Sequence, residues 1–441
     1  MAFKIEIISR EVIKPSHPTP EHLRIYKLSF IDQFAPAVYT PLLLFYPAND
    51  VVDKSQLLKK SLSETLTHFY PLAGRVKDNS IIKCNDDGAV YLEAHVNCHL
   101  TLILENPVAD SLKILHPVNN NNQEEDCPVL LIQASFFACK GLAIGIAVSH
   151  KVGDSSTVTT FLKAWSAIAL GCITEALKPK YVLSALYPPV EFLIKLPPVQ
   201  QLKKSKSTIR RYVFNASKIA ELKAKVASAT VPWPTRVEAV LALLWKCAMA
   251  ASRSKLGTCR PSAMTQMVNI RKRVVPPLPE NSFGNFLGHF TAHEEGIRKT
   301  DLQHLVVQLR LGLDEYYEKH VKKLQEDAHL ALGEAGKEIV NLLTNEDIDH
   351  YTCTSWCRFN IYDIDFGWGR PKWVFSFYEA AIDNSFMFLD TNDGEGVEAW
   401  LTLSEEDIPF LENNKELLSF ASVNPMILIS STGSKILSSR L

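Results

Sequence analysis

The sequence predicts a mixed α/β protein built from two domains. The chain has 441 residues, of which 46% are hydrophobic, so it can bury a large core but exceeds the usual size of one domain. Short β-like runs alternate with amphipathic helical patterns in both halves. A stretch with two Pro-Pro pairs and several lysines separates these halves. We therefore expect an N-terminal domain at residues 1–186, a crossover linker at 187–207 and a C-terminal domain at 208–441.

The composition favours a soluble protein that acts on small molecules. Lys and Arg total 47 and Asp and Glu total 48, and this balance argues against broad attraction to nucleic acid or anionic membranes. The apolar stretch at residues 142–148 is far shorter than the roughly 20 residues of a membrane span, and the N-terminus lacks a signal-peptide core. The nine cysteines are scattered without a Cys-x-x-Cys pair, so we expect reduced thiols and no metal site.

In the first third of the chain, a predicted helix runs into a turn. Leu58, Leu62 and Leu66 recur at helical spacing with Lys and Glu between them, and Pro71 stops this pattern. The segment at residues 119–126 is polar and has no periodicity. It therefore predicts an exposed loop within the N-terminal domain.

A buried strand and a helix follow. Residues 142–148 are apolar at every position, which is typical of a strand covered on both faces. After Asp154 the period changes to that of a helix with an apolar face formed by Val158, Phe161, Leu162, Trp165 and Ile168. The chain therefore changes from strand to helix across residues 150–154.

The C-terminal half carries two clear local signals. Thr235 and Glu238 form a Thr-x-x-Glu capping box, and an apolar helical face follows it. Residues 386–390 and 397–403 flank a turn that contains Gly394, and this arrangement predicts a β-hairpin.

His150 is the first candidate catalytic residue. The motif from His150 to Asp154 puts an imidazole at the mouth of a buried strand, where α/β proteins place reactive groups, and Gly153 permits a sharp turn. An unperturbed imidazole titrates near pH ~6.5, so a neutral histidine could take a proton from an alcohol that attacks a thioester. His-x-x-x-Asp also arises by chance, and Asp154 has a plain reading as the N-cap of the next helix.

A second cluster consists of Asp365, Phe366, Gly367, Trp368 and Gly369. Two glycines around a tryptophan indicate a turn that holds a large aromatic ring, and the physical pattern alone favours a structural loop.

Just upstream of that cluster, period-2 alternation places Thr354, Trp356 and Arg358 on one face of a strand. That face could supply hydrogen-bond donors to a developing oxyanion. The alternative is an ordinary face exposed to solvent.

Several separate stretches share the pattern of one known family. They are AIGIAVSHKVGD ending at Asp154, DFGWGRP starting at Asp365, YPLAGR at residues 70–75, VNIRKR at 268–273 and NSFGN at 281–285. Together they resemble the plant BAHD acyltransferases, in particular the members that acetylate alkaloids and terpenoids. The resemblance spans nearly the whole chain. It implies two chloramphenicol-acetyltransferase-like domains with an active-site channel between them.

The resemblance also implies roles for the candidate residues. His150 would be the general base, and Asp154 would turn away from the substrate to form a salt bridge with Arg271. The motif from Asp365 to Gly369 would keep the channel in shape, away from the chemistry. Thr354 and Trp356 match positions that support the tetrahedral intermediate.

Two departures from the family pattern leave the acceptor pocket open. Lys140 stands where many relatives have glycine, and residues 315–350 follow no pattern that can be aligned.

The function implied is a coenzyme A (CoA)-dependent O-acyltransferase, with acetyl-CoA as co-substrate and a hydroxyl of a plant alkaloid or terpenoid as acceptor. We expect a monomer with no permanently bound cofactor. One alternative is transfer of an aromatic acyl group, benzoyl or hydroxycinnamoyl. The other is a catalytically silent binding homologue, against which the intact His150, Asp154 and Asp365 argue.

The donor site and the cellular address depend on weaker signals. The anionic CoA needs cations, and Lys203, Lys204 and Lys206 in the linker are candidates for this role. Thr235 is a further candidate for binding CoA. Exposed lysines are more often only solvated. The address expected is the cytoplasm. The terminal Ser-Arg-Leu resembles a peroxisomal signal, which makes the peroxisome the alternative.

Overall fold

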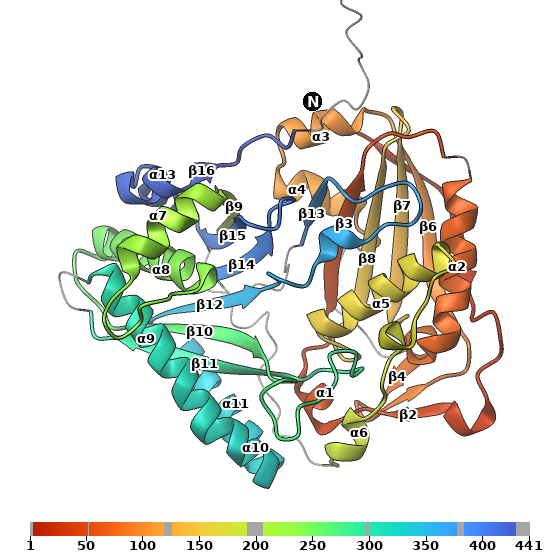
Figure 1. Ribbon diagram of the computed structural model, residues 1–441, viewed down its shortest axis with the longest axis horizontal. Coiled ribbons are helices and arrows are strands. Elements are labelled where there is room, and N and C mark those ends of the chain that lie inside the picture. The colour runs from red at the N-terminus through yellow and green to blue at the C-terminus, as the bar shows by residue number, and fades with distance from the viewer. Residues whose placement is uncertain are drawn as a thin grey trace, which may run out of the picture.

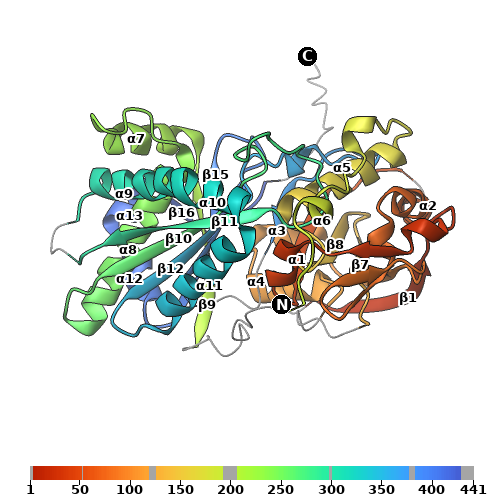
Figure 2. The ribbon, with the colours of Figure 1, turned by 90° about the horizontal axis from the view of Figure 1, so that it is seen from below.

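The computed structural model describes residues 3–51, 53–118, 126–191, 206–296, 300–376 and 383–428. The candidates Lys203 and Lys204, most of the loop predicted at 119–126 and the terminal Ser-Arg-Leu lie outside these residues. Two large sheets lie side by side, each with its own hydrophobic core (Figures 1 and 2).

The first sheet has six strands in the order β1, β6, β7, β8, β3, β13. Their bounds are β1 Ile5–Ile13, β6 Ala89–Val96, β7 Leu130–Phe137, β8 Leu142–Ser149, β3 Tyr39–Tyr46 and β13 Trp373–Phe375. The pair β6–β7 is parallel and the other pairs are antiparallel. Every residue of β8 is buried, as its uninterrupted apolar sequence predicts.

Two helices pack over one face of the first sheet (Figure 1). They are α2 (Lys54–His68) and α5 (Ser155–Ala169). The predicted leucines of α2 are fully buried, and the Trp165 indole of α5 donates to Ser61 Oγ of α2 over 3.0 Å. Both predicted helices are therefore confirmed.

Shorter elements complete the N-terminal half. A three-stranded antiparallel sheet contains β2 (Ile25–Lys27), β5 (Ile81–Lys83) and β4 (Arg75–Lys77). The short helices are α1 (Phe30–Phe34), α3 (Leu100–Glu105), α4 (Ala109–Leu112) and α6 (Leu183–Leu186). In the view from below, α1 and α6 lie near the junction of the two halves (Figure 2).

The second sheet has seven strands in the order β11, β10, β12, β14, β15, β9, β16. Their bounds are β11 Leu287–Glu294, β10 Ser262–Asn269, β12 Asp349–Ser355, β14 Ser385–Asp390, β15 Val397–Ser404, β9 Ser207–Phe214 and β16 Ser422–Val423. The antiparallel pair β14–β15 is the predicted hairpin.

The helices of the C-terminal half surround the second sheet. They are α7 (Ala216–Val226), α8 (Arg236–Leu256), α9 (Leu302–Glu315), α10 (Lys322–Glu326), α11 (Ala328–Thr344), α12 (Ile408–Glu412) and α13 (Lys415–Phe420). A π-helical turn, Tyr316–Val321, joins α9 to α10. The predicted capping box of Thr235 and Glu238 begins α8.

One strand from the C-terminal half crosses into the first sheet. β13 pairs with β3, and its Trp373 indole donates to Glu398 of β15 over 3.0 Å. Glu398 also pairs with Arg211 at 2.7 Å, and both are almost fully buried. These contacts fasten the two halves together, whereas the boundaries at 186 and 208 stay predictions.

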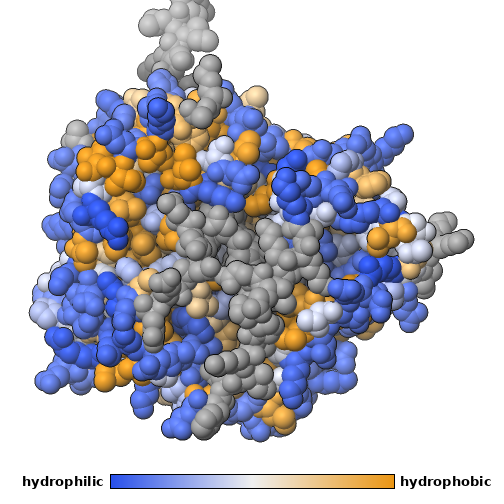
Figure 3. Space-filling view, turned by 180° about the vertical axis from the view of Figure 1, so that it is seen from behind, coloured by the Kyte–Doolittle hydropathy of each residue, from blue (hydrophilic) through white to orange (hydrophobic). Residues whose placement is uncertain are grey.

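Within the described part of the chain, no helix is both long and apolar enough to cross a bilayer. Seen from behind, hydrophobic patches on the described surface are interrupted by hydrophilic side chains (Figure 3).

Candidate active site

His150 follows the last residue of β8, at the junction of the two halves. The register that pairs Ser149 with Tyr39 brings the His150 main-chain N–H to the Val38 carbonyl at 2.8 Å. The ring Nδ1 lies 3.0 Å from Oδ1 of Asn285, a residue of the C-terminal half.

The electrostatic setting of His150 favours the neutral imidazole. Burial lowers the pKa of His150, while a hydrogen bond to its own backbone, the charge of Asp154 and the contact with Asn285 oppose that shift. Because the net shift is downward from an ordinary value near ~6.5, the ring is a free base at neutral pH. This is the protonation state that a general base needs.

Asp154 is committed to structural contacts. Its carboxylate accepts from the Thr157 main-chain N–H at 3.0 Å and so caps α5, and it accepts two bonds from the Arg271 guanidinium at 2.7 and 3.1 Å. It also accepts from the Phe286 N–H at 2.9 Å. Asp154 and Arg271 are both buried. The salt bridge implied by the family resemblance is therefore present, and it is combined with the N-cap expected from the sequence.

Arg271 also organises the segment that carries Asn285. Its guanidinium donates to the carbonyls of Ser282 at 3.1 Å and Gly284 at 2.8 Å. Gly284 has φ of +119°, and a Cβ there would lie 2.9 Å from the Leu183 side chain. Only glycine lets the backbone pass this closely in that conformation. The hydrogen bonds from Arg271 and to Asp154 hold this segment beside the buried ion pair.

The motif from Asp365 to Gly369 forms a tight turn packed on the first sheet. Asp365 accepts from the N–H groups of Gly367 at 2.7 Å and Gly369 at 2.9 Å, and both glycines have φ near +100°. The buried rings of Phe366 and Trp368 pack against Tyr46 of β3, and Phe366 also contacts Trp165 of α5. These contacts are those of a structural anchor.

The predicted face of Thr354, Trp356 and Arg358 does not form. β12 ends at Ser355, and the chain then turns through Arg358, whose φ is +69°. Thr354 is partly buried, Trp356 is buried in the core of the N-terminal half, and Arg358 is exposed. The prediction of one shared strand face was wrong because the left-handed turn at Arg358 breaks the alternation. Among the described residues, no hydrogen bond joins Thr354 or Trp356 to His150.

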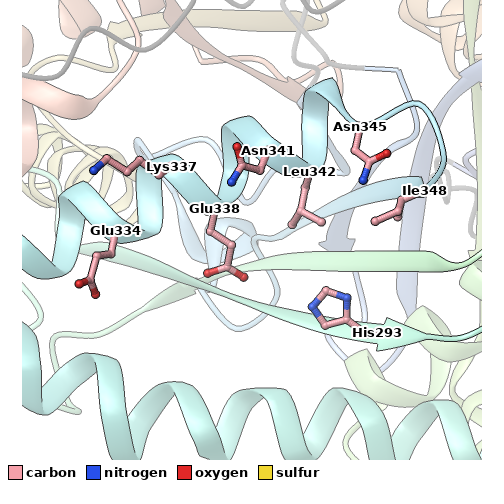
Figure 4. Close-up of a pocket in the computed structure, with 8 residues that line it drawn as sticks. All are labelled: His293, Glu334, Lys337, Glu338, Asn341, Leu342, Asn345 and Ile348. Carbon is pink, nitrogen blue, oxygen red and sulfur yellow. The ribbon is translucent and has the colours of Figure 1, made fainter.

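The donor-site candidates that the structure describes are engaged elsewhere. Lys206 is exposed and pairs with Glu405 at 3.1 Å, and the Thr235 side chain caps α8. A surface cavity of about 550 Å³ lies between α11 and β11, where Glu334, Lys337, Glu338 and Asn341 extend from the helix above His293 (Figure 4). Its lining contains none of the predicted site residues. Within the described ranges, no three His, Cys, Asp or Glu residues gather as metal ligands.

Asp32 and Asn285 are the site residues that sequence reasoning missed. Asn285 ends the NSFGN stretch, and the only local signal at Asp32 is the Ser29-x-x-Asp32 capping box, which says nothing of Asn285. The two are 253 positions apart, yet Asn285 Nδ2 donates to Asp32 Oδ1 at 2.9 Å. The NSFGN stretch was the one signal available for Asn285, and only the fold reveals Asp32.

Known proteins match this chain over nearly its whole length. The model of the Transferase family matches residues 3–418. Akuammiline synthase 1 of Alstonia scholaris is 38% identical, covering 96% of this chain and 99% of the relative. Epi-neemfruitin B 7-O-acetyltransferase of Melia azedarach is 38% identical over 95% and 99% of the two chains.

Two further matches give the family and the fold. BAHD acyltransferase BIA1 of Arabidopsis thaliana is 34% identical over 97% of this chain and 100% of its own. The crystal structure of vinorine synthase superposes with a TM-score of 0.83 at 33% sequence identity. The match covers 96% of this chain and 100% of vinorine synthase. TRI101 of F. sporotrichioides, complexed with coenzyme A and T-2, shares the fold at a TM-score of 0.70 and 19% sequence identity. The match covers 90% of this chain and 99% of TRI101. The chain therefore belongs to the BAHD acyltransferases, enzymes that transfer acyl groups other than aminoacyl groups.

Proposed function

We propose that this enzyme transfers an acetyl group from acetyl-CoA to a hydroxyl of a plant alkaloid or terpenoid. The observation that supports it most is the neutral imidazole of His150, placed where the two halves meet and held through Nδ1 by Asn285. The relatives named for O-acetyl transfer and for akuammiline synthesis support the acetyl donor and the acceptor class.

In the proposed reaction, His150 is the general base for acyl transfer. His150 Nε2 removes the proton of the acceptor hydroxyl while the hydroxyl oxygen attacks the thioester carbonyl carbon. The tetrahedral intermediate then expels the CoA thiolate, and the imidazolium returns its proton to that sulfur. The products are an ester and free CoA, and His150 is neutral again.

Asp154 and Arg271 act as positioning residues in this proposal. Their bidentate pair is buried and turned toward the segment before β11, so it serves the geometry of the site and not proton transfer. Thr354 and Trp356 stay candidates for supporting the intermediate, and the motif from Asp365 to Gly369 has a structural role on the first sheet, away from the chemistry.

Substitution of His150 tests the mechanism. His150→Ala removes the base and is expected to lower turnover by about 10²–10⁴, with an unchanged melting temperature. Thiol release from acetyl-CoA with a panel of terpenoid and alkaloid alcohols measures this. Near-normal turnover by the folded variant would overturn the mechanism, and silence of the wild type toward every acyl-CoA would favour the binding homologue.

The competing donor class is distinguished in the same assay. Benzoyl-CoA and p-coumaroyl-CoA are offered beside acetyl-CoA with one fixed acceptor. A larger kcat/KM for either aromatic thioester would replace acetyl transfer by aromatic acyl transfer.

The linker lysines remain proposals for the CoA phosphates. Charge reversal at Lys203, Lys204 and Lys206 together is expected to raise KM for the donor more than KM for the acceptor. An equal effect on both constants would reject this role.

A further inference from the structure

The side-chain amide of Asn285 has its orientation set by two acceptors. Its Nδ2 lies 2.9 Å from Asp32 Oδ1 and 2.7 Å from the His150 main-chain carbonyl. The main-chain carbonyl cannot donate, so the amide nitrogen must face it and Oδ1 must face the His150 ring. Oδ1 accepts only, and it lies 3.0 Å from His150 Nδ1. Nδ1 therefore carries the proton, and Nε2 keeps its lone pair.

Asp32 is buried and is held in place by several hydrogen bonds. It is 1% exposed, and its carboxylate accepts from the Ser29 N–H at 2.8 Å and hydroxyl at 2.7 Å, which is the capping box of α1. It also accepts from the Asn285 main-chain N–H at 2.6 Å and from the side-chain amide. Burial raises the pKa of Asp32, and these four donated bonds oppose that shift. Four donors on two oxygens match an ionised carboxylate, which can only accept.

The contact between Asp32 and Asn285 joins the two halves of the molecule. Asp32 lies on α1 of the N-terminal half, and Asn285 shortly precedes β11 of the C-terminal half. A Cβ on Gly284 would lie 3.3 Å from both oxygens of Asp32, so the glycine allows this close approach. The segment before β11 is thus held between Asp32 on one side and Asp154 on the other.

We infer that Asp32 is a positioning residue for the proposed base, acting through Asn285 to hold His150 in the Nδ1–H tautomer with Nε2 open to the acceptor hydroxyl. The inference rests on the proposed function of His150 and adds Asp32 and the choice of tautomer to it. Without this chain of contacts the ring could present a protonated Nε2, which cannot abstract a proton.

Two other charged groups belong to the same surroundings. Asp154 favours the imidazolium of His150, and Lys151 disfavours it. The Lys151 ammonium donates to the Gln33 carbonyl at 2.8 Å, and burial lowers its pKa to about 8, while Asp32 acts in the opposite direction. Above neutral pH an activity profile therefore reports Lys151, because His150 is already neutral there, so the tautomer itself has to be observed.

Imidazole ¹⁵N NMR of the full chain measures the tautomer, with the His150 signals assigned from their loss in His150→Gln. The wild type is expected to show a protonated Nδ1 and a bare Nε2. A wild-type ring with its proton on Nε2 overturns the inference, whatever the variants do.

Kinetics of three variants complete the test. Asp32→Leu and Asn285→Leu are expected to lower kcat about 10- to 100-fold, as loss of an outer hydrogen-bond partner does for metal-bound histidines, with little change in KM. Asp32→Asn keeps one oxygen able to accept from Asn285 and is expected to retain more turnover than Asp32→Leu.

A matched control separates positioning from general damage. Asp86 is partly buried and accepts the Thr19 N–H at 2.9 Å and its hydroxyl at 2.6 Å, so Asp86→Leu removes two bonds to a carboxylate outside the site. It is expected to leave kcat and the tautomer unchanged. If His150→Gln is inactive but a folded Asp32→Leu keeps the wild-type kcat, the inference about Asp32 fails and the proposed function stands. An active His150→Gln would instead remove the proposed function.

Discussion

At the scale of single residues, His150 sets the expected pH dependence. Burial lowers its pKa, so the neutral form persists to lower pH than for a free histidine. The acid limb of kcat/KM is therefore expected below pH ~6.5, the ordinary histidine value. Initial rates from about pH 4.5 to 8 measure this, and an acid limb centred above about pH 7 contradicts it.

Arg271 and its neighbour Lys272 form a matched pair for testing burial. Arg271 and Asp154 are fully buried, so Arg271→Leu leaves an unpaired charge and is expected to destabilise the protein by about 3–5 kcal/mol. Lys272 pairs with Glu280 at 2.6 Å on the surface, where 71% of its side chain is exposed. Lys272→Leu is therefore expected to cost about 0–1 kcal/mol.

Urea unfolding of both variants gives the comparison. Equal midpoints would mean that the buried pair contributes no more than the exposed one, and the structural role given to Asp154 would fail.

The sequence predicted part of this site. His150 and Asp154 lie within one short motif, so their proximity and the N-cap follow from local chain geometry. Arg271 required the family resemblance. The role of Asp32 could not be predicted, because its capping box with Ser29 indicates only a helix start and its partner Asn285 is 253 positions away.

At the scale of elements, the apolar pattern together with cap and turn signals was sufficient for β8, α2, α5, α8 and the β14–β15 hairpin. It failed at the end of β12, where the left-handed backbone of Arg358 and Asn360 turns the chain. Neither residue is glycine, so composition gives no warning of the turn. Lys140 also adopts a positive φ of 64°, at the position where the family resemblance led us to expect glycine.

Gly284 allows a prediction about the segment that carries Asn285. Its φ is +119°, and an added Cβ would meet the Leu183 side chain at 2.9 Å. Gly284→Ala is therefore expected to cost about 1–3 kcal/mol and to lower kcat by shifting Asn285. Gly257 is the control, because its φ is +72° but nothing lies within 4 Å of the place where its Cβ would be. Gly257→Ala is expected to cost about 1 kcal/mol with an unchanged kcat. Thermal melts and initial rates measure both, and equal kcat values would contradict the argument.

At the scale of the whole molecule, buried neutral histidines tie stability to pH. Burial lowers the pKa of His116, His289 and His350 to about 4. Below pH ~6.5 the unfolded chain takes up protons at these sites that the folded chain does not. The free energy of unfolding is therefore expected to fall as pH drops from ~6.5 to about 4.

His350 is the variant that checks this linkage. It is 9% exposed, with Nε2 2.9 Å from Thr265 Oγ1. His350→Gln removes one titrating group, so its urea midpoint is expected to depend less steeply on pH between about 6.5 and 4.5. A slope equal to that of the wild type would exclude His350 as a contributor.

The crossing of β13 into the first sheet has a consequence for synthesis of the chain. During translation, the N-terminal half leaves the ribosome with the β3 edge unpaired, because its partner Trp373–Phe375 is made only after several strands of the second sheet. An unpaired edge is a template for pairing with other chains. The nascent N-terminal half is therefore exposed to aggregation until its last strand arrives, and a chaperone that binds nascent strands is expected to improve yield. A separate C-terminal fragment that starts at residue 206 should rescue a truncated N-terminal half only while that fragment keeps β13.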